Sequence, residues 1–275
     1  MWLFDGINTY TEMRKKIAHA VFYISLIQVF VLAQISSDFS EILKTFSFAT
    51  ETEIFDIKIY VAYIYLPIIF SVLENIFRLH DKIGKIFKIR DIFAKKVILN
   101  AYISELAINI TDIRKKDIYN IYEKNKNLRD SIGNHFYDHV SCTNPKIDEH
   151  YVQMALTSWT WVWILLDSII ITVLLDLTSI IWKVNFKFII GISIFIVVQI
   201  ILLIVVICCE CRIHTIKEIH QAVKYDKQNN NGLSNNKLKE VIINALPNRQ
   251  ISNKIGKRRI INKTGNIILH RKASQ

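Results

Sequence analysis

The sequence predicts an all-α integral membrane protein: four transmembrane helices arranged as two hairpins, a helical cytosolic insert between them, and a basic cytosolic tail. Three observations predict this class. Hydrophobic residues make up 51% of the chain and the mean hydropathy is +0.25, which is more apolar than an ordinary soluble domain. The charged residues, with a formal net charge of +11, are segregated from the apolar blocks. Only 7 Gly and 3 Pro interrupt 275 residues, which favours long helices.

The first pair of transmembrane helices is predicted within residues 1–77. Residues 17–35 contain no charged side chain and approach the ~20 residues that a bilayer requires. A cleaved signal peptide would also follow a basic stretch, but the run is long and no small-residue cleavage site follows it, so we expect a retained span. Residues 57–77 contain Pro67 and reach the required length only if end residues such as Glu74 extend toward the lipid headgroups.

The second pair is predicted within residues 157–210. Residues 159–182 are apolar and carry tryptophans at both ends, a pattern typical of interfacial aromatic belts. Residues 187–209 include 22 consecutive uncharged residues, beginning at Phe188. This run predicts the most apolar span of the chain.

The charges between the spans predict the orientation. Residues 36–56 hold one lysine against five carboxylates, whereas residues 210–275 hold 14 Lys and Arg against 4 acidic residues. Residues 78–156 hold 14 Lys and Arg against 10 acidic residues. Because basic residues resist translocation, we expect a multi-pass cell-membrane protein with the insert at 78–156, the tail at 211–275 and both termini in the cytoplasm.

The insert is predicted to be helical. An amphipathic helix begins at Arg78, directly after the second span, and either lies on the inner leaflet or packs on its own domain. Further helices are expected over about 101–121 and 121–140. His135 and His139 share one helix face at a spacing that allows a transition-metal site. A polar helix end also collects such residues without binding a metal, so we expect no metal ion there.

The polar residues within the spans are the main candidates for function. Asp167 and Asp176 are costly in a bilayer, and such groups usually face a bundle interior or water. They are nine residues apart and so lie on nearly opposite faces of one helix. Gln28 and Gln199 are the expected hydrogen-bond partners within the bundle or across a homo-oligomer. These four residues are therefore candidates for a pore lining or a helix contact, and mere tolerance near the headgroups is the simpler alternative.

The basic tail offers candidates for an anionic ligand. Two apolar runs, 260–261 and 267–269, are joined by a polar segment that would suit a small hairpin. The cations around them would attract lipid headgroups or an anionic nucleotide, and a tail that merely fixes topology is the alternative. We expect no specific nucleic-acid binding. The candidate ligand-binding residues are Arg249, Lys257, Arg258 and Arg259.

No known phosphate-binding or hydrolase motif is present in the sequence, so we expect neither a cofactor nor an enzyme. The layout of two spans, an insert of about 80 residues, two spans and a basic tail with Arg249-Gln250-Ile251 and Lys257-Arg258-Arg259 resembles the four-transmembrane effectors associated with bacterial oligonucleotide second-messenger synthetases. The aromatic-rich ending of that family is missing after Arg259.

The resemblance implies a bacterial inner-membrane protein of anti-phage defence. Its cytosolic part would sense a nucleotide second messenger, after which the protein would form a homo-oligomer and permeabilise the membrane. Two other functions remain open from the residues: a membrane-anchored adaptor or scaffold, and a small ion-channel or transporter subunit. The lipid bilayer is the one partner common to all three.

Overall fold

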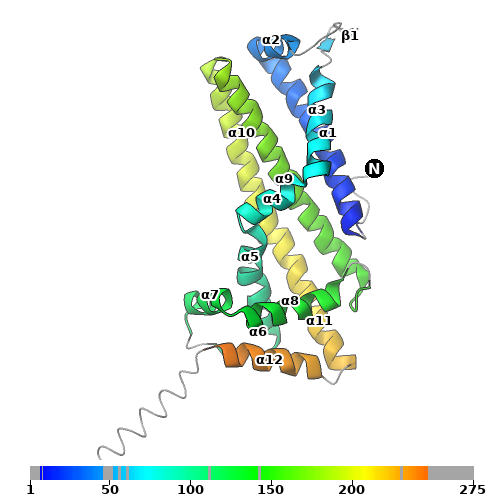
Figure 1. Ribbon diagram of the computed structural model, residues 1–275, viewed down its shortest axis with the longest axis vertical. Coiled ribbons are helices and arrows are strands. Elements are labelled where there is room, and N and C mark those ends of the chain that lie inside the picture. The colour runs from blue at the N-terminus through cyan, green and yellow to red at the C-terminus, as the bar shows by residue number, and fades with distance from the viewer. Residues whose placement is uncertain are drawn as a thin grey trace, which may run out of the picture.

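The structure is a computed structural model, and it describes residues 7, 9–45, 52–54, 57–59, 62–110, 113–141, 144–229 and 232–246. These residues are predominantly helical, and three of their helices are long and apolar enough to cross a membrane. The molecule is elongated, with apolar helices at one end and a layer of shorter helices at the other (Figure 1). Each end has its own hydrophobic core.

Four apolar helices form the first part, which we call the apolar bundle. Helix α1 packs against both α3 and α9, and α9 also packs against α10 (Figure 1). Helix α10 fully buries only Ile192 and Gln199, and most of its other residues are exposed, a pattern that suits contact with lipid. The bounds of these helices are Tyr10–Ile35 for α1, Ala62–Phe77 for α3, Glu149–Ile181 for α9 and Phe186–Val205 for α10.

At the end of the bundle opposite to the layer of shorter helices lie one short helix and two short strands (Figure 1). Helix α2 (Ser37–Thr45) follows α1 directly. Strands β1 (Thr52–Ile54) and β2 (Ile57–Ile59) then form an antiparallel hairpin. The predicted span over residues 57–77 is therefore too long at its start, because β2 occupies its first residues and α3 begins at Ala62.

A sharp turn separates α3 from the segment that follows. Arg78 has a φ of 50° and ends α3, and Lys88 has the same φ between α4 (Leu79–Ile86) and α5 (Ile89–Phe93). The expected amphipathic helix is thus broken at Lys88, and the turn at Arg78 separates its start from α3. The turn lets α4 cross α9, where Gly84 lies so close to Trp163 that a Cβ would be 2.9 Å from Cη2 of the ring.

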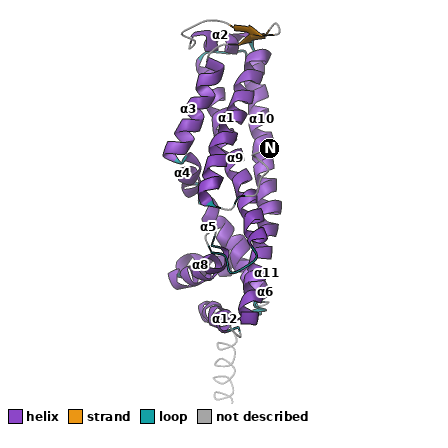
Figure 2. Cartoon of the chain, turned by 90° about the vertical axis from the view of Figure 1, so that its right-hand side faces the viewer, coloured by secondary structure: helices purple, strands orange, loops and turns teal. Residues whose placement is uncertain are grey.

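The remaining helices form the second part, which we call the polar lobe. Helix α10 continues without interruption into it, giving a rod of 44 residues, and α12 then crosses this rod near its end (Figures 1 and 2). The lobe has a core in which Tyr102, Leu128 and Ile219 are fully buried. Its segments are η1 (Ala94–Ile98), α6 (Leu99–Glu105), α7 (Lys115–Lys124), α8 (Lys126–Val140), α11 (Arg212–Asn229) and α12 (Leu233–Ala245). Segment η2 (Val206–Cys211) joins α10 to α11 and packs against the core of the bundle.

The two helices predicted over 101–121 and 121–140 differ from the observed ones. Helix α6 ends at Glu105, and Ala107 has a φ of 48°, so the chain turns where a helix was expected. A new helix begins only at Lys115. Helix α8 is close to the expected third helix, and the side chain of Asn125 caps it by accepting a hydrogen bond from the Leu128 amide at 3.1 Å.

Candidate functional site

A cluster of three ionisable side chains is buried where α3, α4 and α9 meet. Glu74 lies near the end of α3, His80 in the first turn of α4 and Asp167 in the middle of α9. All three are at most 4% exposed. One carboxylate oxygen of each acid and one ring nitrogen of His80 lie within 4.8 Å of one another. We call these residues the bundle cluster.

His80 connects Glu74 of α3 to Asp81, which is the next residue of α4. Its Nδ1 is hydrogen-bonded to Oε1 of Glu74, and its backbone amide donates to Oε2 at 3.4 Å. Its Nε2 lies 3.8 Å from Oδ1 of Asp81. Among the described residues, neither this Nε2 nor either oxygen of Asp167 has a hydrogen-bond partner. Three buried polar atoms of the bundle cluster are therefore without a hydrogen-bond partner among the described residues.

Asp81 links the bundle cluster to the surface. The Tyr10 hydroxyl donates to its Oδ2 at 2.7 Å, and the Arg90 guanidinium donates to Oδ1 at 3.0 Å. Its side chain is 18% exposed. Partial burial raises the pKa of Asp81, but the hydrogen bond from Tyr10 and the nearby positive charges outweigh this effect and hold the pKa below its ordinary value. A continuous series of ionisable groups therefore runs from Asp167 to the surface.

A second polar group in the bundle joins α1, α9 and α10. The Gln28 amide nitrogen donates to the Ser168 hydroxyl at 2.8 Å, and that of Gln199 donates to the same hydroxyl at 3.0 Å. The Thr172 hydroxyl donates to Gln199 Oε1 at 3.1 Å. The two glutamines thus bond to hydroxyl groups of α9 rather than to Asp167, because Asp167 faces α3 and α4.

Asp176 lies apart from the bundle cluster. It is half-buried, and its Oδ2 accepts a hydrogen bond from the Ser193 hydroxyl of α10 at 3.5 Å. Its position agrees with the helical geometry, which places it on the face of α9 opposite to Asp167. The two aspartates do not share a site.

The tryptophans of α9 divide between two environments. Trp163, expected in an interfacial belt, is fully buried, and its ring centroid lies 5.7 Å from that of His80. The Arg90 guanidinium stacks over the same ring at 5.4 Å from its centroid. Only Trp182, at the other end of α9, is exposed as a belt residue would be. The belt assignment is wrong for Trp163 because α4 covers it.

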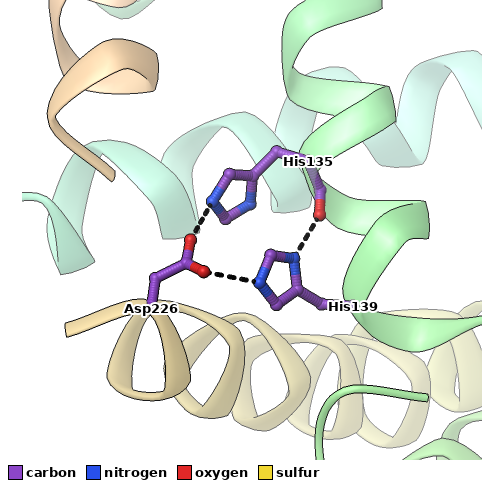
Figure 3. A group of neighbouring side chains, drawn as sticks. All are labelled: His135, His139 and Asp226. Carbon is purple, nitrogen blue, oxygen red and sulfur yellow. Dashed lines mark hydrogen bonds and ion pairs between the residues drawn. The ribbon is translucent and has the colours of Figure 1, made fainter. Parts of the chain in front are cut away.

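The polar lobe contains a second buried group of ionisable residues, which we call the lobe cluster. His135 and His139 of α8 both face Asp226 of α11 (Figure 3). Nε2 of His135 lies 2.9 Å from Oδ2 of Asp226, and Nε2 of His139 lies 2.9 Å from Oδ1. All three residues are at most 7% exposed. The sequence placed the histidines on one face but contained no sign of Asp226.

The Nδ1 atoms of these two histidines also have hydrogen-bond partners. Nδ1 of His139 donates to the carbonyl oxygen of His135 at 2.7 Å, and Nδ1 of His135 lies 2.9 Å from the Tyr102 hydroxyl. Burial and the neighbouring His139 lower the pKa of His135. Burial raises the pKa of Asp226, but the hydrogen bonds and charges of the two histidines lower it more, so it remains below the usual value.

Sequence reasoning missed Glu74, His80 and Asp226 as site residues. Glu74 was expected to reach toward the headgroups, yet it is buried, because His80 returns to it after the turn at Arg78. A glutamate at the end of an apolar run, followed six residues later by a histidine, was the available signal. Asp226 is 87 residues from His139, so only the fold brings them together.

The predicted ligand-binding residues of the tail lie outside the described residues, as does the expected small hairpin at 260–269. They are Arg249, Lys257, Arg258 and Arg259.

The fold and its two buried clusters define a class: a helical protein in which a bundle, with helices long and apolar enough to cross a membrane, is joined to a polar helical lobe. The comparison with protein families narrows this class. Residues 9–243 match the YmfE protein family, so the chain belongs to that family. No match was found among curated proteins or among solved structures.

Proposed function

We propose that the protein crosses the cell membrane four times, through the three long apolar helices α1, α9 and α10 and the shorter helix α3. The polar lobe and both termini would then lie on the cytoplasmic side. Helix α3 has 16 residues, about 24 Å of helix, and a slightly short span is accommodated by local thinning of the bilayer. It pairs with α1, which is one of the long apolar helices. Helix α2 and strand β1, which belong to the acidic segment, lie at the end of the bundle away from the basic lobe (Figure 1), as the positive-inside rule requires.

We further propose that the protein moves protons or other small cations across this membrane. The observation that carries this proposal is the bundle cluster: a buried Asp167 with no hydrogen-bond partner for either oxygen among the described residues, beside Glu74 and His80. Asp167 is 14 residues from the end of α9 at Ile181, about 21 Å along the helix. It therefore lies within the hydrocarbon thickness of about 30 Å.

The charges of the bundle cluster favour a bound cation. Two carboxylates share one histidine, so at most one negative charge is balanced when His80 is protonated. An ionised carboxylate at the centre of a spanning helix costs about 2.5–3.5 kcal/mol on insertion scales, and such groups usually mark ion pathways. A proton or a small cation between Glu74 and Asp167 would remove the remaining charge and occupy the free oxygen atoms.

The polar groups on either side suggest the route. On the cytoplasmic side, His80 and Asp81 lead from Glu74 to the surface. On the other side, Ser168 and Thr172 continue along α9 with the two glutamines bonded to them. These hydroxyl and amide groups offer hydrogen bonds to a hydrated ion or a proton-carrying water.

The test is ion flux through the full chain reconstituted in liposomes. A pH-sensitive dye inside the vesicles reports proton entry under an imposed membrane potential, and Na⁺ and K⁺ gradients test other cations. We expect flux well above that of empty vesicles. Asp167→Asn and Glu74→Gln should each lower it at least tenfold, because each removes a group that binds the ion. Absence of flux from the wild-type chain would overturn the proposal and favour an adaptor.

Asp176→Asn is the matched control, because it makes the same chemical change on the same helix but on the opposite face. It should retain flux close to that of the wild type. Equal loss in Asp167→Asn and Asp176→Asn, at equal reconstituted protein, would contradict the assignment of the ion site to the bundle cluster.

A narrower form of the proposal is a triggered effector that forms a homo-oligomer and permeabilises the bacterial inner membrane when it senses a nucleotide second messenger. What supports a trigger is the unbroken rod from α10 into α11, which joins the lobe to the bundle mechanically. Expression with a membrane-potential dye separates the two forms. A triggered effector leaves the cells polarised until cyclic oligonucleotide is supplied, whereas a constitutive carrier changes the potential at once.

A further inference from the structure

We propose that His135, His139 and Asp226 form a binding site for a divalent transition-metal ion, Zn²⁺ in the first instance, inside the polar lobe. This inference does not depend on ion movement through the bundle. It concerns a different set of residues, on α8 and α11, and its test does not measure flux.

The first argument is the convergence of ligand atoms. The two histidines are one turn apart on α8, and their rings are stacked with centroids 4.6 Å apart. Both Nε2 atoms therefore point in one direction, toward the two oxygens of Asp226 (Figure 3). The three ligand atoms lie within 4.8 Å of one another. Two imidazoles and one carboxylate form a ligand set that catalytic zinc sites and other transition-metal sites use.

The second argument is the hydrogen bonding of the outer ring nitrogens. A carbonyl oxygen only accepts, so Nδ1 of His139 carries a proton in its bond to the His135 carbonyl. In a neutral ring, Nε2 of His139 then presents a lone pair toward a carboxylate oxygen at 2.9 Å. That arrangement requires either an additional proton or a cation between the two atoms. Metal-binding histidines characteristically have their other nitrogen fixed in this way.

The third argument is the distance between the ligand atoms. In a tetrahedral zinc site with bonds of about 2.0 Å, neighbouring ligand atoms are about 3.3 Å apart. The Nε2 atoms lie 2.9 Å from the Asp226 oxygens. A shift of a few tenths of an ångström would therefore admit the ion. Ca²⁺ and Mg²⁺ prefer sets made of oxygen atoms, so two imidazoles favour Zn²⁺ or a similar transition metal.

An ion at this position would join two segments that are distant in the sequence. His139 and Asp226 are 87 residues apart, and Asp226 lies on the helix that continues from α10. The metal would thus fix α8 to the cytoplasmic end of the rod. Its removal would loosen the lobe without changing any residue of the bundle.

The test is metal content and thermal stability of the purified full chain in detergent. The protein is stripped with a chelator, dialysed against micromolar Zn²⁺ and then assayed by elemental mass spectrometry. We expect about one zinc ion per chain and a rise in the unfolding temperature on adding Zn²⁺, because a ligand that binds only the folded state stabilises it. Asp226→Asn should lower zinc affinity at least tenfold and abolish most of this rise.

Two control variants keep the result interpretable. His220→Gln changes an exposed histidine on the same helix α11, and Asp167→Asn changes the other buried cluster. Both should retain the zinc ion. A wild-type chain without zinc at micromolar concentration would overturn the inference, as would zinc that is lost in Asp167→Asn but kept in Asp226→Asn. If Asp226→Asn fails to fold, His135→Gln provides the same comparison with the carboxylate intact.

Discussion

The bundle cluster and the lobe cluster contain the same kinds of side chain in opposite proportions. In the bundle, Glu74 and Asp167 share His80, so negative charge is in excess. In the lobe, His135 and His139 share Asp226, so the carboxylate is bonded on both oxygens. The difference is also visible in the hydrogen bonds: among the described residues, unbonded buried atoms occur at Asp167 and His80 but not in the lobe cluster.

This contrast indicates that the buried ionisable residues have different roles in the lobe and in the bundle. A carboxylate paired on both oxygens stabilises the packing of α8 on α11, because removal of either partner leaves a buried charge unpaired. A buried carboxylate without partners destabilises the bundle unless something else binds to it. The lobe cluster is therefore expected to support structure first, and the bundle cluster to support function at the expense of stability.

The largest effect expected from this comparison follows removal of a lobe histidine. His139→Ala should lower the free energy of unfolding by about 3 kcal/mol, because it removes the imidazole that is hydrogen-bonded to Oδ1 of the buried Asp226. Asp167→Asn should cause a smaller loss, since neither carboxylate oxygen of Asp167 has a hydrogen-bond partner among the described residues. Both are measured by thermal unfolding of the full chain in detergent with a chelator present, so that metal binding makes no contribution.

His220→Ala is the control for the lobe, because it removes an exposed ion pair with Glu105 that is worth about 0–1 kcal/mol. If Asp167→Asn destabilises the chain as much as His139→Ala does, the two clusters have the same role and the contrast fails.

An intermediate effect is expected where α4 crosses α9. Gly84→Ala would place a Cβ 2.9 Å from Cη2 and 3.0 Å from Cζ3 of the buried Trp163 ring. Displacement of α4 should cost about 1–3 kcal/mol and move His80 away from Glu74. Hydrogen exchange should therefore increase in α4 but not in the lobe helices α8 and α11.

Gly133→Ala is the matched control, since a Cβ there meets no described atom within 4 Å. It should raise stability by about 0.5–1 kcal/mol through helix propensity. Equal stability of the two variants would show that α4 does not require close contact with α9.

The smallest effect concerns a residue between the two clusters. Glu218 of α11 is buried and lines a cavity of about 440 Å³ together with Arg90 and Trp163. Burial raises the pKa of Glu218 well above its ordinary value. The folded state thus keeps a proton that the unfolded state releases above about pH 4.3, and stability falls as the pH rises from there to the folded-state pKa.

Glu218→Gln removes this dependence. The variant should differ little from the wild type near pH 4, and its advantage in unfolding temperature should grow as the pH rises toward 8. Unfolding scans across this pH range measure the difference. A difference that stays constant with pH would mean that Glu218 titrates in the folded state as it does in the unfolded chain.

The two clusters show which site residues the sequence could predict and which it could not. The spacing of His135 and His139 placed both on one face of α8, because four residues make about one helical turn. The cost of charge in lipid singled out Asp167 and Asp176, and the structure places only Asp167 in a cluster. Neither argument could find the partner that completes each cluster, because Glu74 and Asp226 come from helices that only the fold brings near. The turn at Arg78, with a φ of 50°, carried no sequence signal, since glycine is the residue expected in that conformation.

Sequence alone determined that the chain is helical with apolar blocks long enough to cross a membrane, because apolar blocks and segregated basic residues reflect how each residue is solvated, which is a local property. The sequence also identified Asp167 as a costly charge within a span, but it did not identify the buried Glu74 or Asp226. Tertiary structure decided which of them meet, why α4 turns back across α9, and how one long rod unites bundle and lobe. These depend on contacts between residues as much as 147 positions apart, such as Asp38 and Asn185, and no periodicity along the chain encodes such contacts.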